Sequence, residues 1–201
     1  MSTISTKERI LTASLALFNE RGYRSVTMRM IADSLSISVG NLTYHFPKKQ
    51  DIVDTLMNES FQRNAACGKI TTLAGLYHLL SQMLDTLTRN AFFFLDDDFA
   101  HDERHIYHYQ PLRALLSDAL TTLTADGIFL PSFDTQTRET LLTLLLMSHI
   151  TWLKQTLRPG AGSVMSAEEF LHAHFVVFFP YFTPAGQDAY EQLKKDCCPS
   201  L

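Results

Sequence analysis

The sequence predicts an all-α protein, and three observations support this prediction. Nearly every segment of the 201-residue chain repeats its apolar residues at the spacing of an amphipathic helix, and no extended alternation of apolar and polar residues indicates a strand. Good capping residues precede several of these segments. Turn signals separate them, at Asp126-Gly127, Arg158-Pro159-Gly160 and Thr183-Pro184. We therefore expect helices joined by turns.

The first predicted helix runs from about Ser5 to Arg21. Ser5 and Glu8 have the spacing of a capping box, in which each side chain accepts a hydrogen bond from the other residue's backbone N–H. Gly22 is suited to end the helix, because glycine is the usual residue just past a helix C-terminus. One face of this helix carries a mostly apolar stripe formed by Ile10, Ser14, Leu17 and Phe18.

Two short helices joined by a tight turn come next. Thr27 is a good N-cap for the first of them, and Ser38 caps the second, which runs from Val39 to about His45. Pro47 ends the second helix. The expected inward positions of the first are Ile31, Ala32 and Leu35, and the turn is Ser36-Ile37-Ser38. This layout is typical of a helix-turn-helix, whose second helix enters the DNA major groove.

A longer helix, Lys48–Gly68, is the predicted connector to a helical body that begins near Ile70. We expect a DNA-binding domain over residues 1–48 and a ligand-binding and dimerisation domain over 49–201. The helices predicted for the body cover residues 71–94, 111–127, 134–157, 166–182 and 184–196.

The charge of the chain is unevenly distributed. Residues 1–64 carry eight Lys or Arg and six Asp or Glu, a net +2, whereas residues 65–201 carry nine and fifteen, a net −6. A mildly basic end on an acidic body suits a protein that presents one end to phosphates. The three cysteines form no disulfide framework, and the chain opens with no signal peptide, so we expect a reducing, cytoplasmic setting. Its longest apolar runs are too short to cross a membrane.

Residues 1–50 resemble the DNA-binding domain of the TetR/AcrR family of repressors. The matching parts are ALFNERGY at the end of the first helix, Val26 to Ala32, Ser38 to Phe46, and Lys49. The resemblance implies an all-α fold of nine or ten helices: a three-helix helix-turn-helix domain followed by a divergent ligand-binding body. It also implies a homodimer.

The resemblance also implies which residues contact DNA. Val39 and Gly40 lie in the first turn of the recognition helix, and Gly40 would allow close approach to base edges or would only relieve crowding. Asn41 would read a base edge, bind a phosphate or simply be solvated. Tyr44 and His45 match positions that usually hold phosphate oxygens, although His45 could instead be a packed interfacial residue.

Residues flanking the recognition helix are expected to hold the DNA backbone. Lys49 begins the fourth helix, where free N–H groups already favour an anion, so its ammonium would complete a phosphate clamp. Thr27 and Arg29 would touch the backbone from the second helix, or Thr27 would only cap it. Thr43 departs from the family, which commonly has an aromatic residue there. Its hydroxyl could reach a phosphate, or its methyl a thymine.

The body is predicted to hold a dimer face and a pocket. Segments 134–157 and 166–182 are apolar on more than one face, so residues 134–182 are expected to pair with a second copy around a twofold axis, or else to be covered within the chain. An apolar or aromatic small molecule is the expected effector. The residues predicted to contact it, each of which could instead be ordinary core, are Phe61, Phe93, Tyr107, His149 and Trp152.

The segment from Asp96 to His108 has the spacing of a metal site. His101, His105 and His108 would share one face of a helix beside several carboxylates. No cysteine or known ligand signature supports this reading. An exposed acidic loop with incidental histidines is the preferred interpretation, and no metal or cofactor is expected.

The sequence therefore predicts a ligand-responsive transcriptional regulator, most simply a repressor that binds a palindromic double-stranded operator as a homodimer and is not an enzyme. The effector would rotate the connector helix and so change the spacing of the two DNA-binding heads. Two alternatives remain: a metal-dependent enzyme that uses the histidine segment, and a DNA-architectural protein that needs no ligand.

Overall fold

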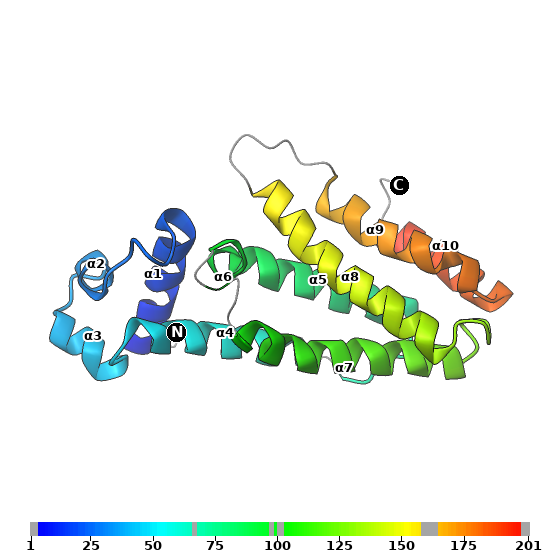
Figure 1. Cartoon of the computed structure of the whole chain (residues 1–201), viewed down its shortest axis with the longest axis horizontal. Coiled ribbons are helices and arrows are strands. Elements are labelled where there is room, and N and C mark those ends of the chain that lie inside the picture. Colours follow the sequence, from blue (N-terminus) through cyan, green and yellow to red (C-terminus); the bar gives the residue numbers. More distant parts are fainter. Residues whose placement is uncertain (1–3, 66–67, 97–98, 100–102, 158–164, 198–201) are drawn as a thin grey trace. The chain divides into compact units, whose positions relative to one another are not determined.

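The computed structural model describes residues 4–65, 68–96, 99, 103–157 and 165–197, without the side chains of 61, 63–65 and 103–109. Among these residues the protein is all-α, as predicted, with ten α-helices and one short 3-10 helix (Figure 1). In order they are α1 Thr6–Arg21, α2 Met28–Ser34, α3 Val39–His45, α4 Lys49–Ala65, α5 Leu73–Arg89, α6 Ala91–Leu95, α7 Glu103–Ala125, α8 Thr135–Thr156, α9 Ala167–Phe178, η1 Phe179–Tyr181 and α10 Pro184–Cys197.

The chain divides into two compact units. The first contains Met1–Gln62 and Arg89–His108, and the second contains Arg63–Thr88 and Tyr109–Leu201. Neither unit is continuous in sequence, because α6 and its flanks join the N-terminal helices. The predicted domain boundary between residues 48 and 49 stays a prediction.

The first unit has its own apolar core. Helix α1 contacts α2 and α6, and α2 contacts α3. Phe18 of α1 packs on Phe92 of α6, with ring centroids 5.1 Å apart, and Phe99 packs on Phe92 and Phe93. The helices also bury Ile10, Leu11, Val26, Ile31, Ala32, Leu42, Phe46, Ile52, Val53 and Met57.

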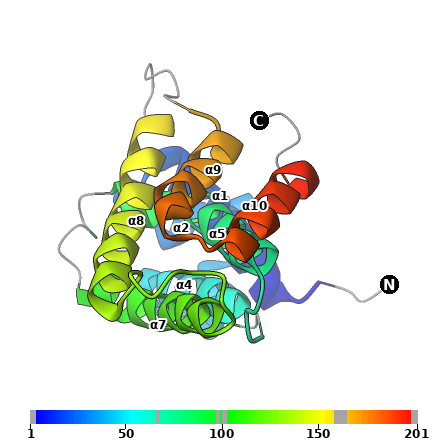
Figure 2. The same ribbon diagram turned by 90° about the vertical axis from the view of Figure 1, so that its right-hand side faces the viewer.

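The second unit is built around helices α5, α7, α8, α9 and α10, with α9 lying between α8 and α10 (Figure 2). Its core is one continuous cluster of leucine and phenylalanine side chains. Gly186 fits tightly: a Cβ atom there would lie 2.2 Å from the carbonyl oxygen of Ile128, so the close approach requires glycine. Within the described residues, no helix is both long and apolar enough to span a membrane.

The predicted boundaries hold in the first unit. The capping box of Ser5 and Glu8 forms, and Gly22 ends α1 by donating its N–H to the carbonyl of Phe18. Thr27 and Ser38 cap α2 and α3 as predicted. Helix α4 begins at Lys49, one residue later than expected.

Three predicted segments of the body are wrong in detail. The expected helix 71–94 is broken at Asn90, because the side chain of Asn19 bonds the carbonyl of Arg89 and the N–H of Phe92 and so satisfies backbone groups that a continuous helix would pair internally. The expected loop ending at His108 is helical from Glu103, so α7 starts earlier than predicted and includes Pro111. The predicted helix 166–182 ends at Phe178 and continues as the 3-10 turn, where Pro180 removes an N–H donor.

Candidate nucleic-acid interface

Helices α2 and α3 are short, and side-chain caps define their first turns. The Thr27 hydroxyl accepts a hydrogen bond from the N–H of Met30 at 3.2 Å, and the Ser38 hydroxyl accepts one from the N–H of Asn41 at 3.1 Å. Each cap satisfies one of the backbone donors that a helix start leaves unpaired. The predicted capping role of Thr27 is therefore confirmed, and Arg29 lies exposed two residues further along.

Helix α3 has one buried edge and one open face. Leu42 is fully buried, as is Phe46 directly after the helix, which fixes how α3 packs. The open side carries Val39, Gly40, Asn41 and Tyr44, and the side chain of Tyr44 is 84% exposed. Thr43 and His45 are half-buried at its edges. This face combines the amide of Asn41 and the phenol of Tyr44 with the bare backbone of Gly40. The amide and the phenol can bind base edges and phosphates, and the bare backbone allows close approach.

The turn between the two helices holds a strained residue. Ser36 has φ +55°, the left-handed region that residues with a Cβ rarely adopt. Its N–H donates to the carbonyl of Asp33, and the next N–H, from Ile37, donates to Ala32. These two bonds hold the tight reversal between α2 and α3.

Gly40 is not required by packing inside the chain. A Cβ atom at this position would have the Ser38 hydroxyl oxygen, 3.8 Å away, as its nearest neighbour, and its φ is not in the left-handed region. A glycine early in a helix lowers helix stability by about 0.5–1 kcal/mol relative to alanine. Packing within the chain therefore does not explain the glycine at position 40.

Thr43 and the two aromatic neighbours have defined contacts. The Thr43 hydroxyl donates to the carbonyl of Gly40 at 3.2 Å, so it is held against the helix's own backbone. The rings of Tyr44 and His45 meet edge to face, with centroids 5.3 Å apart. The ammonium of Lys7 lies 5.8 Å from the centre of the Phe46 ring.

The ammonium of Lys49 contacts the connection between α1 and α2. It donates hydrogen bonds to the carbonyls of Tyr23 at 2.6 Å and Val26 at 2.8 Å, and it lies 3.9 Å from the centre of the Tyr23 ring. Tyr23 is held from other directions too. Its N–H donates to the carboxylate of Asp96, and its hydroxyl donates to the side-chain oxygen of Gln50.

The predicted effector contacts are distributed over both units. Phe93 is buried in the first unit among Phe92, Phe94 and Phe99. The side chains of Phe61 and Tyr107 lie outside the described residues. His149 and Trp152 lie in the second unit.

His149 and Trp152 share one neighbour, Phe170. The Trp152 ring stacks on Phe170, with centroids 5.3 Å apart, and the His149 ring meets Phe170 edge-on. Nδ1 of His149 lies 2.8 Å from the carbonyl of Leu145, so this nitrogen carries the hydrogen and Nε2 is left as an acceptor. His149 Nε2 is buried and has no hydrogen-bond partner among the described residues. Burial and the neighbouring His174 lower the pKa of His149 to about 3.

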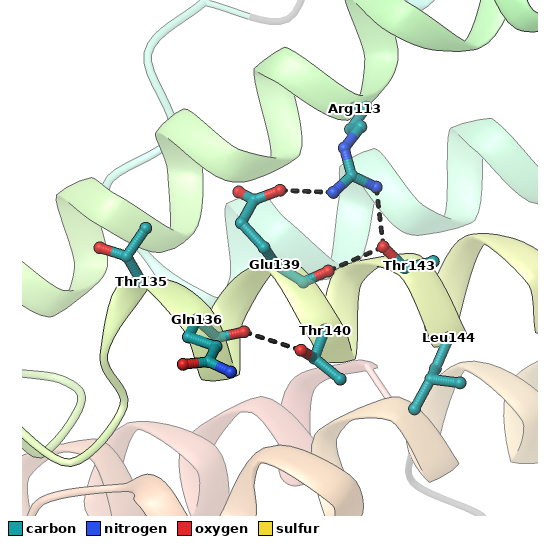
Figure 3. A pocket seen from close by; sticks show the side chains of 7 residues that line it. All are labelled: Arg113, Thr135, Gln136, Glu139, Thr140, Thr143 and Leu144. Carbon is teal, nitrogen blue, oxygen red and sulfur yellow. Dashed lines mark hydrogen bonds and ion pairs between the residues drawn. The ribbon is translucent and has the colours of Figure 1, made fainter.

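Two hollows lie on the second unit. A cavity of about 310 Å³ between α8 and α9 has mainly apolar walls, with Ser148 and His174 as its polar groups. A shallower hollow of about 650 Å³ lies along α7 and α8 (Figure 3). The Ser117 hydroxyl and the Arg113 guanidinium both donate to Glu139 and lower the pKa of its carboxyl. Arg113 also donates to the hydroxyl of Thr143. These polar groups are bonded to one another.

The proposed metal ligands fall mostly outside the described residues. This applies to all of His101 and to the side chains of His105 and His108. In the part of the chain that is described, no group of three or more His, Cys, Asp or Glu side chains is placed to hold a metal ion.

Sequence reasoning missed Ser36, the Asn19 contacts and the carbonyl contacts of Lys49. Nothing in the residue types at positions 19 and 36 indicated these roles. The sequence did contain one signal for the Lys49 contacts, since a tyrosine directly follows the glycine that ends α1, but the pairing of that tyrosine with a residue 26 positions later depends on the fold.

Residues 10–56 match the family model for bacterial regulatory proteins of the tetR family. Among curated relatives, the HTH-type transcriptional repressor KstR of Mycolicibacterium smegmatis is 34% identical over 85 residues, which are 41% of this chain and 42% of that protein. The probable HTH-type transcriptional regulator YttP of Bacillus subtilis is 28% identical over 90 residues, 42% of this chain and 44% of that protein. The chain thus matches less than half the length of these relatives.

Solved structures extend the likeness of fold to the body. A TetR-family transcriptional regulator from Marinobacter aquaeolei superimposes with a TM-score of 0.77 at 24% identity, covering 96% of this chain and 98% of that one. The regulator KstR2 of Mycobacterium tuberculosis superimposes with a TM-score of 0.64 at 21% identity, covering 90% and 97%. At these identities the superpositions establish the fold alone.

Proposed function

We propose that the chain is a DNA-binding transcriptional regulator of the tetR family that represses its target genes, because residues 10–56 match the model of that family and KstR, a curated relative, is a repressor. Members of this family are regulators and not enzymes, which removes the support for a metal-dependent enzyme. The observation that carries the proposal is the open face of α3. Packing within the chain explains neither the glycine at position 40 nor the exposed ring of Tyr44 on this face. The proposal of repression, rather than activation, is supported by the curated relative KstR, which is a repressor. We place the protein in the cytoplasm with its DNA.

The open face of α3 would enter the major groove. Gly40 lets the first turn approach the bases, and Asn41 offers an amide that can read an adenine edge. Tyr44 and His45 would hold phosphate oxygens on one side of the groove. Thr27 and Arg29 of α2 would hold the backbone, and Val39 would contact it or a thymine methyl.

A homodimer would supply the second recognition helix. The face formed by α8 and α9 exposes large apolar side chains: Leu144 at 58%, Met147 at 65%, and Val176 and Val177 at 52% each. A patch of this kind on two adjacent helices is typical of a protein-protein interface. A second copy of residues 134–182 would cover it around a twofold axis, and the cavity between α8 and α9 would receive a side chain of that copy. A palindromic operator follows from this symmetry.

The effector is proposed to bind the second unit near His149 and Trp152. The buried Nε2 of His149 can accept a hydrogen bond and has no partner in the described part of the chain, so a matching ligand would be mainly apolar and carry one donor, such as a hydroxyl or an amine. The predicted contacts Phe61, Phe93 and Tyr107 belong to the first unit, and their part in effector binding stays a prediction. Ligand binding would shift α4 and change the distance between the two recognition helices.

The test of DNA recognition is selection of a binding sequence from a random duplex library, followed by affinity measurements on the selected duplex and on a random duplex. We expect a palindromic sequence that is bound at least about a thousandfold more tightly than random DNA. Tyr44→Phe, which removes only the phenol oxygen, should weaken both complexes about tenfold. Equal affinity for both duplexes would support the architectural alternative.

The effector proposal has its own test. Thermal shifts should be larger with 1-naphthol, which has a donor, than with 1-methylnaphthalene, which has none, and His149→Phe should remove the difference. Spin labels on α3 of each protomer should then report a changed distance with the bound probe. An unchanged distance would refute the proposed movement of α4.

A further inference from the structure

We propose that Lys49 is a positioning residue for the helix-turn-helix: its ammonium holds the connection between α1 and α2 against the start of α4, and it does not bind a DNA phosphate. This inference rests on the proposed DNA-binding function. The sequence predicted a phosphate contact for Lys49, but in the structure its ammonium is directed at carbonyl oxygens and a ring of the chain itself. We therefore propose a positioning role in place of the phosphate contact.

The contacts of the ammonium define its role. Nζ donates to the carbonyls of Tyr23 and Val26, at 2.6 and 2.8 Å, and lies 3.9 Å from the centre of the Tyr23 ring. Hydrogen bonds from a charged donor are stronger than neutral ones, and a cation over an aromatic face adds to them. A single side chain from α4 thus bonds two carbonyls that are three residues apart in another segment, which is a clamp on that segment's conformation.

The position of Lys49 at the start of α4 does not by itself explain these contacts. It is the first residue of α4, where the helix dipole disfavours a cation, and the acid of the first turn, Asp51, already accepts a hydrogen bond from the N–H of Lys48. A lysine placed there would ordinarily extend into solvent. Its inward contacts with two carbonyls and a ring show that the local acceptors, rather than the helix start, hold the charge.

The clamp acts on Val26, the residue directly before the N-cap of α2. Val26 is fully buried, and its neighbour Thr27 is the N-cap of α2. Because α2 packs on α3, a displacement of Val26 would move the start of α2 and then the recognition helix. Tyr23 is also anchored through its N–H to Asp96 beyond α6, so the α1–α2 connection is held from α4 and from α6. Lys49 therefore affects DNA binding through the placement of α3.

Lys49→Met tests this role, because methionine keeps the length and apolar stem but removes the charge and the donors. Affinity should be measured over a range of salt on the selected duplex and on a random duplex, at a temperature where circular dichroism shows the variant fully folded. The matched control is Lys48→Met, the same change at the exposed neighbouring residue.

A positioning role predicts about a tenfold or greater loss of affinity for the selected duplex and little change for the random duplex. The salt dependence on random DNA should stay the same. A phosphate contact predicts instead an equal loss on both duplexes and a slope reduced by about 0.9 on a log–log plot. That result, or no loss on either duplex, would overturn the proposal. Lys48→Met should leave the ratio of the two affinities unchanged.

A second measurement on the unmodified protein holds even if Lys49→Met does not fold. In ¹H–¹⁵N spectra of the lysine ammonium groups, the Lys49 signal should be protected from exchange without DNA and should keep its position when the selected duplex is added. Scalar coupling between this nitrogen and a DNA phosphorus would demonstrate a phosphate contact and refute the positioning role. If the wild-type protein selects no sequence, the proposed function fails, whereas the protection of Lys49 in the free protein is still tested.

Discussion

Two exposed surfaces of this protein, the open face of α3 and the outer face of α8 and α9, differ in the chemistry of what they expose. The α3 face presents an 84% exposed tyrosine, an amide and a glycine. The α8–α9 face presents leucine, methionine and two valines that are each more than half exposed. Both surfaces leave large side chains in solvent, which a folded chain normally avoids when they are purely apolar.

The difference shows that exposure alone does not identify a partner. Polar groups beside a residue without a side chain, here Gly40, fit the edges of bases and the oxygens of phosphates. Contiguous aliphatic groups can lower their free energy only by contact with another apolar surface, because they make no hydrogen bonds with water or with nucleic acid. On the same criterion we propose DNA as the partner of the first surface and a copy of the chain as the partner of the second. The two proposed partners can be tested separately.

The largest effect should come from a charge on the α8–α9 face. Met147→Glu would place two carboxylates in the proposed dimer interface without partners, which costs several kcal/mol, so dimerisation should weaken at least about a hundredfold. The monomer should stay folded, because Met147 is 65% exposed. Analytical ultracentrifugation measures the association. Ile4→Glu, at an exposed apolar residue outside this face, is the control, and a fully dimeric Met147→Glu variant would refute the interface.

The second prediction concerns pH. Burial lowers the pKa of His149 to about 3 and that of His174 to about 4, both below the usual value near 6.5. Between pH 6.5 and 4 the unfolded chain binds protons that the folded chain does not, so the free energy of unfolding should fall as the pH is lowered. It is highest above pH 6.5. We expect about 1 kcal/mol per pH unit for each histidine over this window.

Denaturant unfolding at several pH values measures this dependence. His149→Phe should reduce the loss of stability between pH 6.5 and 4. An identical pH dependence in wild type and His149→Phe would show that this imidazole is not held neutral by the fold. The result bears on the second unit alone.

Gly40→Ala should raise the stability of the protein and lower its affinity for DNA. Stability should rise by about 0.5–1 kcal/mol, because alanine is the better helix former and its Cβ meets only the Ser38 hydroxyl oxygen at 3.8 Å. Affinity for the selected duplex should fall about tenfold if the backbone approaches base edges there. Melting curves and fluorescence anisotropy measure the two quantities. A variant that gains stability and keeps its DNA affinity would remove Gly40 from the contact surface.

The sequence predicted the elements of the first unit well because their signals are local. Caps at Ser5, Thr27 and Ser38 each act within three residues, so the sequence window that reveals them also forms them. The break at Asn90 could not be found in this way, because it depends on Asn19, about 70 residues away. The carbonyl contacts of Lys49 could likewise not be predicted from the helix it begins, because their acceptors belong to another segment.

The exposed apolar face could be predicted for a related reason. Helices α8 and α9 have apolar residues on more than one side, and a single chain can cover only part of such a helix. The sequence therefore indicated that some of these residues would remain uncovered. Which ones do depends on how α8 packs with α9, so the exposure of Leu144 and Val177 had to come from the structure.

The smallest effect is expected at the turn between α2 and α3, and it separates the fold of the head from its contacts. Ser36 adopts φ +55°, which costs a residue with a Cβ about 1 kcal/mol, whereas glycine adopts it freely. Ser36→Gly should therefore stabilise the protein by about 0.5 kcal/mol, after the greater entropy of glycine in the unfolded chain is subtracted. DNA affinity should not change, since Ser36 lies outside the proposed contact residues. Chemical denaturation and anisotropy would test both parts, with Ser34→Gly as a control that should destabilise, because glycine disfavours helix at the end of α2. A loss of DNA affinity in Ser36→Gly would mean that the strained turn itself helps to place α3 in the groove.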